Sequence, residues 1–213
     1  TGGTEIVTHE IDISKFSPEN PRQLAYDKNG VKIYAFPVVH TIDGSMGYRL
    51  EYKGLSFAYT ADSEISTFEA EQSKGADIWI HEVFPIPEEY ALVTKMPLEH
   101  ATNALAQHTT PKELGIVFDL AKPGIGIGSH YTLGDAMVDS FFKGVGTTYD
   151  GPVMLAHDLS VINVTPEQIV IRQVKTSMLA EVPEPPVLEG VDMNPGKPSD
   201  SKRPDWLTKT KIE

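Results

Sequence analysis

Four side chains that can bind metals or exchange protons follow apolar, strand-like runs in this sequence. They are His40 after "AFPVV", Asp62 after "FAYTA", Glu82 after "DIWIH" and His130 after "IGIGS". A buried strand places the residue at its end on the rim of a sheet, so these four side chains can converge there. Imidazole and carboxylate groups are ligands of zinc, manganese and iron. The joint pattern predicts a metal site; taken singly, each residue is better explained as a hydrogen-bonded rim, turn or capping residue.

The segments that carry these side chains are predicted to alternate between strands and helices, as in a layered α/β fold. Alternating apolar residues predict strands over residues 5–12, 30–39, 47–62, 76–84, 125–131, 151–165 and 167–175, the third being a hairpin that turns at Lys53-Gly54. Helices are predicted over residues 65–75 and 135–145 and twice within 98–124, where the second begins at Thr110 and Pro111. The "PGIGIG" run lacks the Lys and helix start of a phosphate-binding loop and is predicted to enter a strand.

The composition limits both the ligands and the partners of the chain. Its 213 residues suit one domain or a large piece of one, and they include no cysteine, so any metal must be held by His, Asp or Glu. The net charge of −12 argues against nucleic acid as a partner, because phosphate backbones are bound through Lys and Arg. No apolar run has the length of a membrane span, and the first residues lack the pattern of a signal peptide. The compartment is not indicated.

Five motifs, in order along roughly residues 30–172, resemble those of the C-terminal half of metallo-β-lactamase-fold hydrolases, in the branch similar to ribonuclease Z and arylsulfatases. They are His40, Ala61-Asp62-Ser63, His81-Glu82-Val83, His108-Thr109-Thr110 and Ser129-His130-Tyr131. The resemblance implies an α/β fold, the αββα sandwich, of which this chain supplies mainly the C-terminal ββα/αβ half. Residues 1–175 are then the C-terminal portion of that domain. Residues 176–213 are expected to form an extended Pro-rich tail that packs on a partner chain, with Trp206 and Leu207 as anchors.

The resemblance also implies roles for individual residues. His40 would bind one metal, His130 a second, and Asp62 would bridge them. One or two ions are expected, zinc first, with manganese or iron as alternatives. A metal-bound hydroxide would attack a small-molecule ester, lactone, phosphodiester or sulfate ester. His108 would donate a proton to the leaving group, and Glu82 would orient its ring.

One family motif is missing from this chain. The resemblance implies an "HxHxDH" segment that supplies the first metal ligands, but here His9 stands alone in "VTHEID". A cleaved two-chain enzyme, a degenerate chain without catalysis, and a fragment made during preparation all remain open. We expect the first, with an N-terminal chain of the same precursor carrying "HxHxDH", because the other ligand-type residues persist. Thr1 would then be a candidate nucleophile for self-cleavage, with ordinary proteolysis as the alternative.

Two other functions are left open by the same residues. Hydrolytic dehalogenation would use the same metal-bound hydroxide, and a non-catalytic scaffold or binding subunit would keep the fold without the metals. The partners expected are the N-terminal chain and a small-molecule substrate, with neither nucleic acid nor membrane, and a higher homo-oligomer stays open. His81 is expected to point away from Glu82, because successive strand residues alternate. His157-Asp158 is expected to be structural, or to orient a metal ligand without binding the metal itself. Tyr131 is a candidate for substrate contact.

Overall fold

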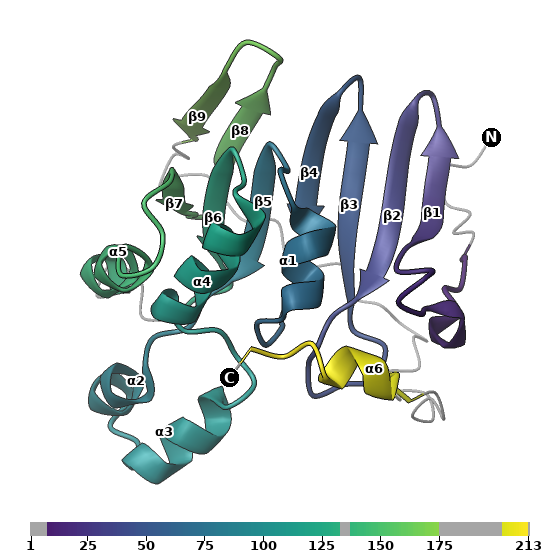
Figure 1. Cartoon of the computed structure of the whole chain (residues 1–213). Coiled ribbons are helices and arrows are strands. Elements are labelled where there is room, and N and C mark those ends of the chain that lie inside the picture. Colours follow the sequence, from purple (N-terminus) through teal and green to yellow (C-terminus); the bar gives the residue numbers. More distant parts are fainter. Residues whose placement is uncertain (1–7, 133–136, 175–201, 213) are drawn as a thin grey trace, which may run out of the picture.

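A seven-stranded mixed sheet forms the centre of the computed structural model, which describes residues 8–132, 137–174 and 202–212 (Figure 1). In spatial order the strands are β1 (Gln23–Lys28), β2 (Val31–Pro37), β3 (Met46–Tyr52), β4 (Leu55–Tyr59), β5 (Ile78–Glu82), β6 (Ile125–Ser129) and β7 (Val153–Leu155). Strands β1 to β4 pair antiparallel, and β4 to β7 pair parallel. Strand β2 therefore runs in the same direction as β4, β5, β6 and β7, and the carboxyl ends of all five meet at one edge. The predicted α/β class is confirmed.

Two tight turns build the antiparallel half of the sheet. Strands β3 and β4 are joined through Lys53 and Gly54, whose φ angles are +50° and +80°. Strands β1 and β2 are joined in the same way through Asn29 and Gly30, at +56° and +78°. Two consecutive left-handed residues match the right-handed twist of a hairpin, and Asn-Gly is the preferred pair for such a turn. The hairpin predicted at Lys53-Gly54 is confirmed.

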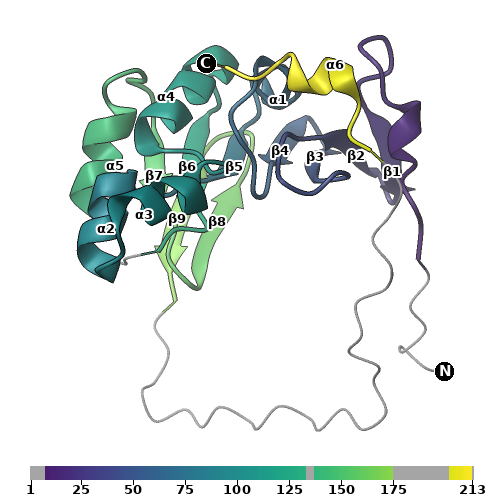
Figure 2. The same ribbon diagram turned by 90° about the horizontal axis from the view of Figure 1, so that it is seen from below.

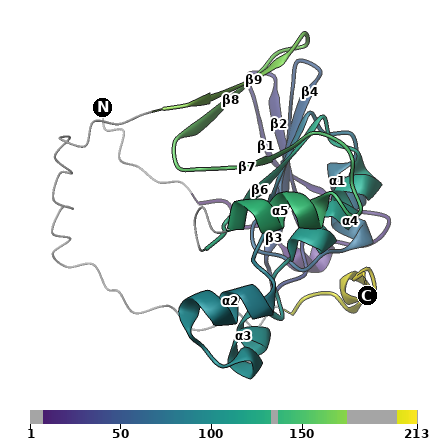
Figure 3. The ribbon, with the colours of Figure 1, turned by 90° about the vertical axis from the view of Figure 1, so that its left-hand side faces the viewer.

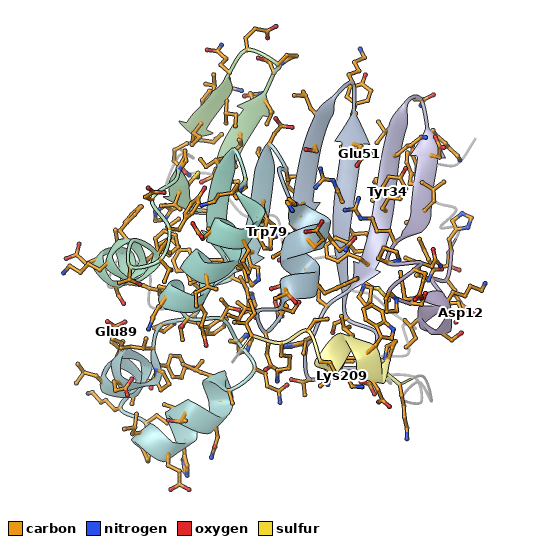
Figure 4. All side chains as sticks on the ribbon, viewed as in Figure 1. Asp12, Tyr34, Glu51, Trp79, Glu89 and Lys209 are labelled. Carbon is orange, nitrogen blue, oxygen red and sulfur yellow. The ribbon has the colours of Figure 1, made fainter. Side chains whose placement is uncertain are left out.

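Helices cover one face of the sheet. They are α1 (Thr67–Ser73), α4 (Pro111–Ala121) and α5 (Val138–Val145), and their apolar residues form one core cluster with Trp79 of β5 (Figures 2 and 4). Helix α4 begins at the predicted Thr110 and Pro111, with a capping box between Thr110 and Glu113. A Cβ built on Gly126 would lie 2.4 Å from Phe118 Cε2, so an α4 ring packs directly on the backbone of β6. The "PGIGIG" run is thus a strand that helices approach closely.

The opposite face of the sheet is only partly covered by the residues described. Strands β8 (Ser160–Val164) and β9 (Ile169–Gln173) form a separate hairpin that packs on Ile78, Ile125 and Ile127 (Figure 3). Farther along this face, the strand register aligns Tyr48 with Tyr59 and Tyr59 with Ile80. Tyr48 and Tyr59 are 37% and 40% exposed. The sheet therefore presents an aromatic surface beside the β8–β9 hairpin.

Two local predictions were wrong or incomplete. Residues 8–12 of the predicted strand 5–12 pair with no strand among the residues described, and a short helix η1 (Ile13–Lys15) follows, started by Asp12 accepting a hydrogen bond from Ser14 N at 3.0 Å. Residues 5–7 lie outside the described residues. Helix α2 (Pro87–Thr94) was not predicted, although it precedes the predicted α3 (Leu98–Leu105). None of the helices described is long and apolar enough to cross a membrane.

The end of the predicted tail lies on this chain itself. Helix α6 (Asp205–Thr208) buries Leu207 completely, and Trp206 contacts Phe68 of α1 edge-on at 4.9 Å between ring centroids (Figure 1). The following residues pair with the segment before and at the start of α1: Thr67 N donates to Thr210 O at 2.8 Å, and Ile212 N to Ile65 O at 3.2 Å. Trp206 and Leu207 thus anchor the tail on its own chain, where a partner was expected. Residues 176–201 lie outside the described residues, so their packing on a partner stays a prediction.

Candidate metal centre

The strand directions bring the predicted site residues to one edge of the sheet. His40 follows β2, Asp62 follows β4, Glu82 ends β5 and His130 follows β6. His130 Nε2 lies 3.3 Å from Asp62 Oδ2. The ring of His108, which precedes α4, has its centroid 5.5 Å from that of His40 and 6.2 Å from that of His130. The structure therefore gathers all five residues predicted from the strand ends and motifs.

Left-handed backbone turns place two of these side chains. Ala61, just before Asp62, has a φ of +50°, and His130 itself has a φ of +53°. A residue with a Cβ pays about 1–2 kcal/mol for this conformation, which the surrounding structure must offset. Both turns bend the chain sharply as it leaves the sheet. They aim Asp62 and His130 at each other.

Glu82 joins the Asp62 turn to His108. Its carboxyl group is fully buried: Oε1 accepts a hydrogen bond from Ser63 N at 2.6 Å, and Oε2 lies 2.6 Å from His108 Nδ1. Burial raises the pKa of Glu82 to about 9. Burial, helped by the nearby His40, lowers the pKa of His108. Both groups are therefore neutral near pH 7, and the contact is a hydrogen bond rather than an ion pair.

A neutral pair also fixes where the ring proton lies. A protonated Glu82 donates through Oε2 to Nδ1 of His108, which leaves the imidazole proton on Nε2. That nitrogen is then a proton donor on the side of the ring away from Glu82. The roles predicted for the two residues stay predictions, but the geometry permits them.

Phe84 is a residue of the site that the sequence did not single out. Its ring stacks on His108 with centroids 4.1 Å apart, and it meets His130 edge-on at 5.3 Å. Phe84 is 8% exposed, so it closes the apolar side of the histidine group. The available signal was its position two residues after Glu82 in an apolar run.

His40 is held from both its backbone and its ring. Its Nδ1 lies 3.3 Å from the carbonyl oxygen of Gln107, and the guanidinium of Arg203 donates to its backbone oxygen. A ring that donates from Nδ1 keeps the lone pair of Nε2 for a metal. This arrangement is typical of metal-binding histidines.

The donor types fit a zinc-like ion, but the described part of the chain does not complete a ligand shell. It contains no group of three or more His, Asp or Glu side chains arranged to hold a metal ion. The side chains of His130 and Asp62 are 53% and 39% exposed, so solvent reaches this side of the group. His40, Asp62 and His130 are thus suitable as part of a shell, with further ligands to be supplied from elsewhere.

Other predicted residues lie around or outside this group. His81 is fully buried, with Nε2 3.2 Å from Glu69 Oε1. Tyr131 Oη lies 3.1 Å from His157 Nδ1, and these two residues line an open hollow together with Ser129, His130, Ala156 and Asp158. His157 therefore lies beside the site, at the end of the parallel strand β7. Thr1 lies outside the described residues.

The sequence matches no family model and no curated protein, but solved structures resemble the chain. A metallo-β-lactamase fold protein, YhfI from Bacillus subtilis, is 21% identical over 66% of this chain and 51% of its own, with a TM-score of 0.49. The short form of human tRNase Z is 20% identical over 54% and 41%, with a TM-score of 0.41. Zinc-bound PqqB from Methylobacterium extorquens is 15% identical over 64% and 48%, with a TM-score of 0.49.

Part of the chain thus resembles metallo-β-lactamase-fold proteins in structure. The matches span about half of the length of these structures, or less.

Proposed function

We propose that this chain supplies metal ligands and a proton-donating pair to a metal-dependent hydrolase of the metallo-β-lactamase superfamily. One observation carries the proposal: His40, Asp62, His108 and His130 meet at the edge where the parallel strands end, above a buried carboxyl group that binds one of them. Strongly shifted pKa values, such as that of Glu82, which burial raises to about 9, cluster at functional sites.

His40, Asp62 and His130 would hold the metal, zinc first, as one ion or two. When bound, such an ion acts as a Lewis acid and lowers the pKa of water. The chain's own contribution to the reaction is the Glu82–His108 pair. Glu82 holds the proton of His108 on Nε2. As that proton passes to a leaving group, the proton of Glu82 can move to Nδ1, which leaves a neutral ring and an ionised Glu82. Phe84 keeps water from the face of the ring on which it stacks.

The remaining ligands would come from an N-terminal chain of the same precursor that carries "HxHxDH". The exposed side chains of His130 and Asp62 and the aromatic sheet surface at Tyr48 and Tyr59 support this arrangement. The substrate would be a small-molecule ester, lactone, phosphodiester or sulfate ester. The net charge of −12 disfavours nucleic acid.

Metal content and chain composition test the proposal on protein purified from its source. Denaturing mass spectrometry should find a second chain in equal amount, and elemental analysis should find a transition metal bound in stoichiometric amount. His130→Ala should lose that metal and keep its circular dichroism spectrum. The matched control is His100→Ala, which removes an exposed histidine on α3. A metal-free native protein, or metal retained equally by His130→Ala, would favour the non-catalytic scaffold.

A further inference from the structure

The residue that follows Asp62 is held at each of its polar groups. Ser63 is fully buried; its N donates to Glu82 Oε1 at 2.6 Å, and its carbonyl oxygen accepts from Thr109 Oγ1 at 2.8 Å. Its hydroxyl lies 3.4 Å from His81 Nε2, which in turn meets Glu69. The Asp62 turn is therefore fixed to the sheet and to the start of α4 through its neighbour.

Thr109 occupies the centre of these contacts. It is 1% exposed, its hydroxyl binds Ser63, and its carbonyl oxygen accepts from Phe84 N at 2.8 Å. The residue before it is His108. Through its hydroxyl and its backbone carbonyl, this one residue thus connects the turn that carries Asp62, the end of β5 and the loop that carries His108.

A rigid support lies directly behind Thr109. Thr110 starts α4, where its N and hydroxyl donate to Glu113 Oε2 at 2.8 Å and 2.6 Å, and Pro111 is the first helical residue. A capped helix start with proline has little conformational freedom. The position of Thr109 is therefore set by a stable element, and it can hold the strained turn at Ala61 in place.

We infer that Thr109 is a positioning residue for the proposed metal centre, acting through Ser63 to hold Asp62 at its distance from His130. The inference rests on the proposed function for what Asp62 binds. The hydrogen bond from Thr109 to Ser63, called the brace below, is a property of the chain itself. Removing a partner that orients a ligand typically weakens metal binding about 10–100-fold. Loss of the hydroxyl would also leave the buried carbonyl of Ser63 without its partner.

Thr109→Val is the test, because it keeps the shape of the side chain and removes the donor. We expect Zn²⁺ binding to the native protein, measured by competition with a chromophoric chelator, to weaken about 10–100-fold. Amide hydrogen exchange of residues 61–66 in the metal-free protein should become at least tenfold faster. Thr109→Ser should restore both values. Thr102→Val is the matched control, since its hydroxyl donates to Leu98 O at 2.9 Å in the exposed helix α3.

Each outcome decides a separate point. Unchanged exchange in Thr109→Val would refute the brace. Faster exchange with unchanged Zn²⁺ affinity would show a purely structural role and overturn the inference. If the wild-type protein binds no Zn²⁺ but exchange is still faster in Thr109→Val, the proposed function is refuted and the positioning role of Thr109 for the Asp62 turn is kept. If Thr109→Val fails to fold, Thr109→Cys, whose thiol is a weaker donor of similar size, replaces it. Its Zn²⁺ affinity and amide exchange rates should lie between those of the wild type and those expected for Thr109→Val. Wild-type values for both would overturn the inference.

Discussion

Substituting Glu82 by Gln should stabilise the chain at neutral pH and remove part of the fall in stability as the pH rises. In the folded chain Glu82 keeps its proton up to about pH 9, whereas the unfolded chain releases it near the ordinary value of 4.5. Because the folded state binds more protons in this window, the free energy of unfolding falls as the pH rises from 4.5 towards 9. Between pH 7 and pH 9 the expected fall is about 2 kcal/mol, obtained from the two pKa values.

The Gln side chain has the groups to keep both contacts at neutral pH. Its oxygen can accept from Ser63 N and its amide can donate to His108 Nδ1. Because Gln takes up no proton on folding, the variant should already be about 3 kcal/mol more stable than the wild type at pH 7, from the same two pKa values. Burial lowers the pKa of His108 from 6.5, so its protonation changes the free energy of unfolding only below about pH 7. It therefore does not contribute to the difference between the two proteins from pH 7 to pH 9. The difference between the two proteins should therefore grow above pH 7.

Urea unfolding of the metal-free protein at pH 7, 8 and 9, followed by the fluorescence of the buried Trp79, measures this difference. Glu167→Gln is the control, because that carboxylate is exposed in the turn between β8 and β9. If wild type and Glu82→Gln differ by the same free energy at pH 7 and pH 9, Glu82 is ionised at neutral pH. The account of a neutral Glu82–His108 pair would then be wrong.

Two further substitutions test the packing that supports the site. Gly126→Ala should destabilise the chain by about 1–3 kcal/mol in urea unfolding, because the new Cβ would lie 2.4 Å from the Phe118 ring. Unchanged stability would mean that α4 does not pack on β6 as described. Leu207→Ala should lower the free energy of unfolding by about 2–5 kcal/mol, because this α6 side chain is fully buried. A change near zero would contradict the packing of residues 202–212 on this chain.

The elements that carry local signals could be predicted from the sequence. The hairpin at Lys53-Gly54 and the start of α4 at Thr110-Pro111 depend on residues whose backbone preferences are strong and short in range. Helix α2 had such a signal too, in Pro87 at its first position with Glu88 in its first turn. The strand predicted over residues 5–12 had alternation alone, and alternation does not specify a pairing partner.

The site could be predicted only in part. Residue type and position after a strand pointed to His40, Asp62 and His130, but their proximity depends on the order β4-β5-β6, which local patterns do not encode. Phe84 was not singled out and Ser63 was given no role of its own, because their importance lies in contacts across the sheet edge. Ser63 is a turn residue in the sequence, and only the fold shows Glu82 and Thr109 on either side of it.

The contacts of residues 202–212 have a consequence for the order of folding. Arg203 reaches the backbone of His40 across 163 positions, and Thr210 reaches Thr67 across 143. Contacts this distant in sequence close large loops and form late, after the local hairpins and helices. During synthesis, the segments bearing His40 and Asp62 emerge long before the residues that fasten them. The sheet can thus assemble first, and the edge with its histidines becomes rigid in the final step of folding.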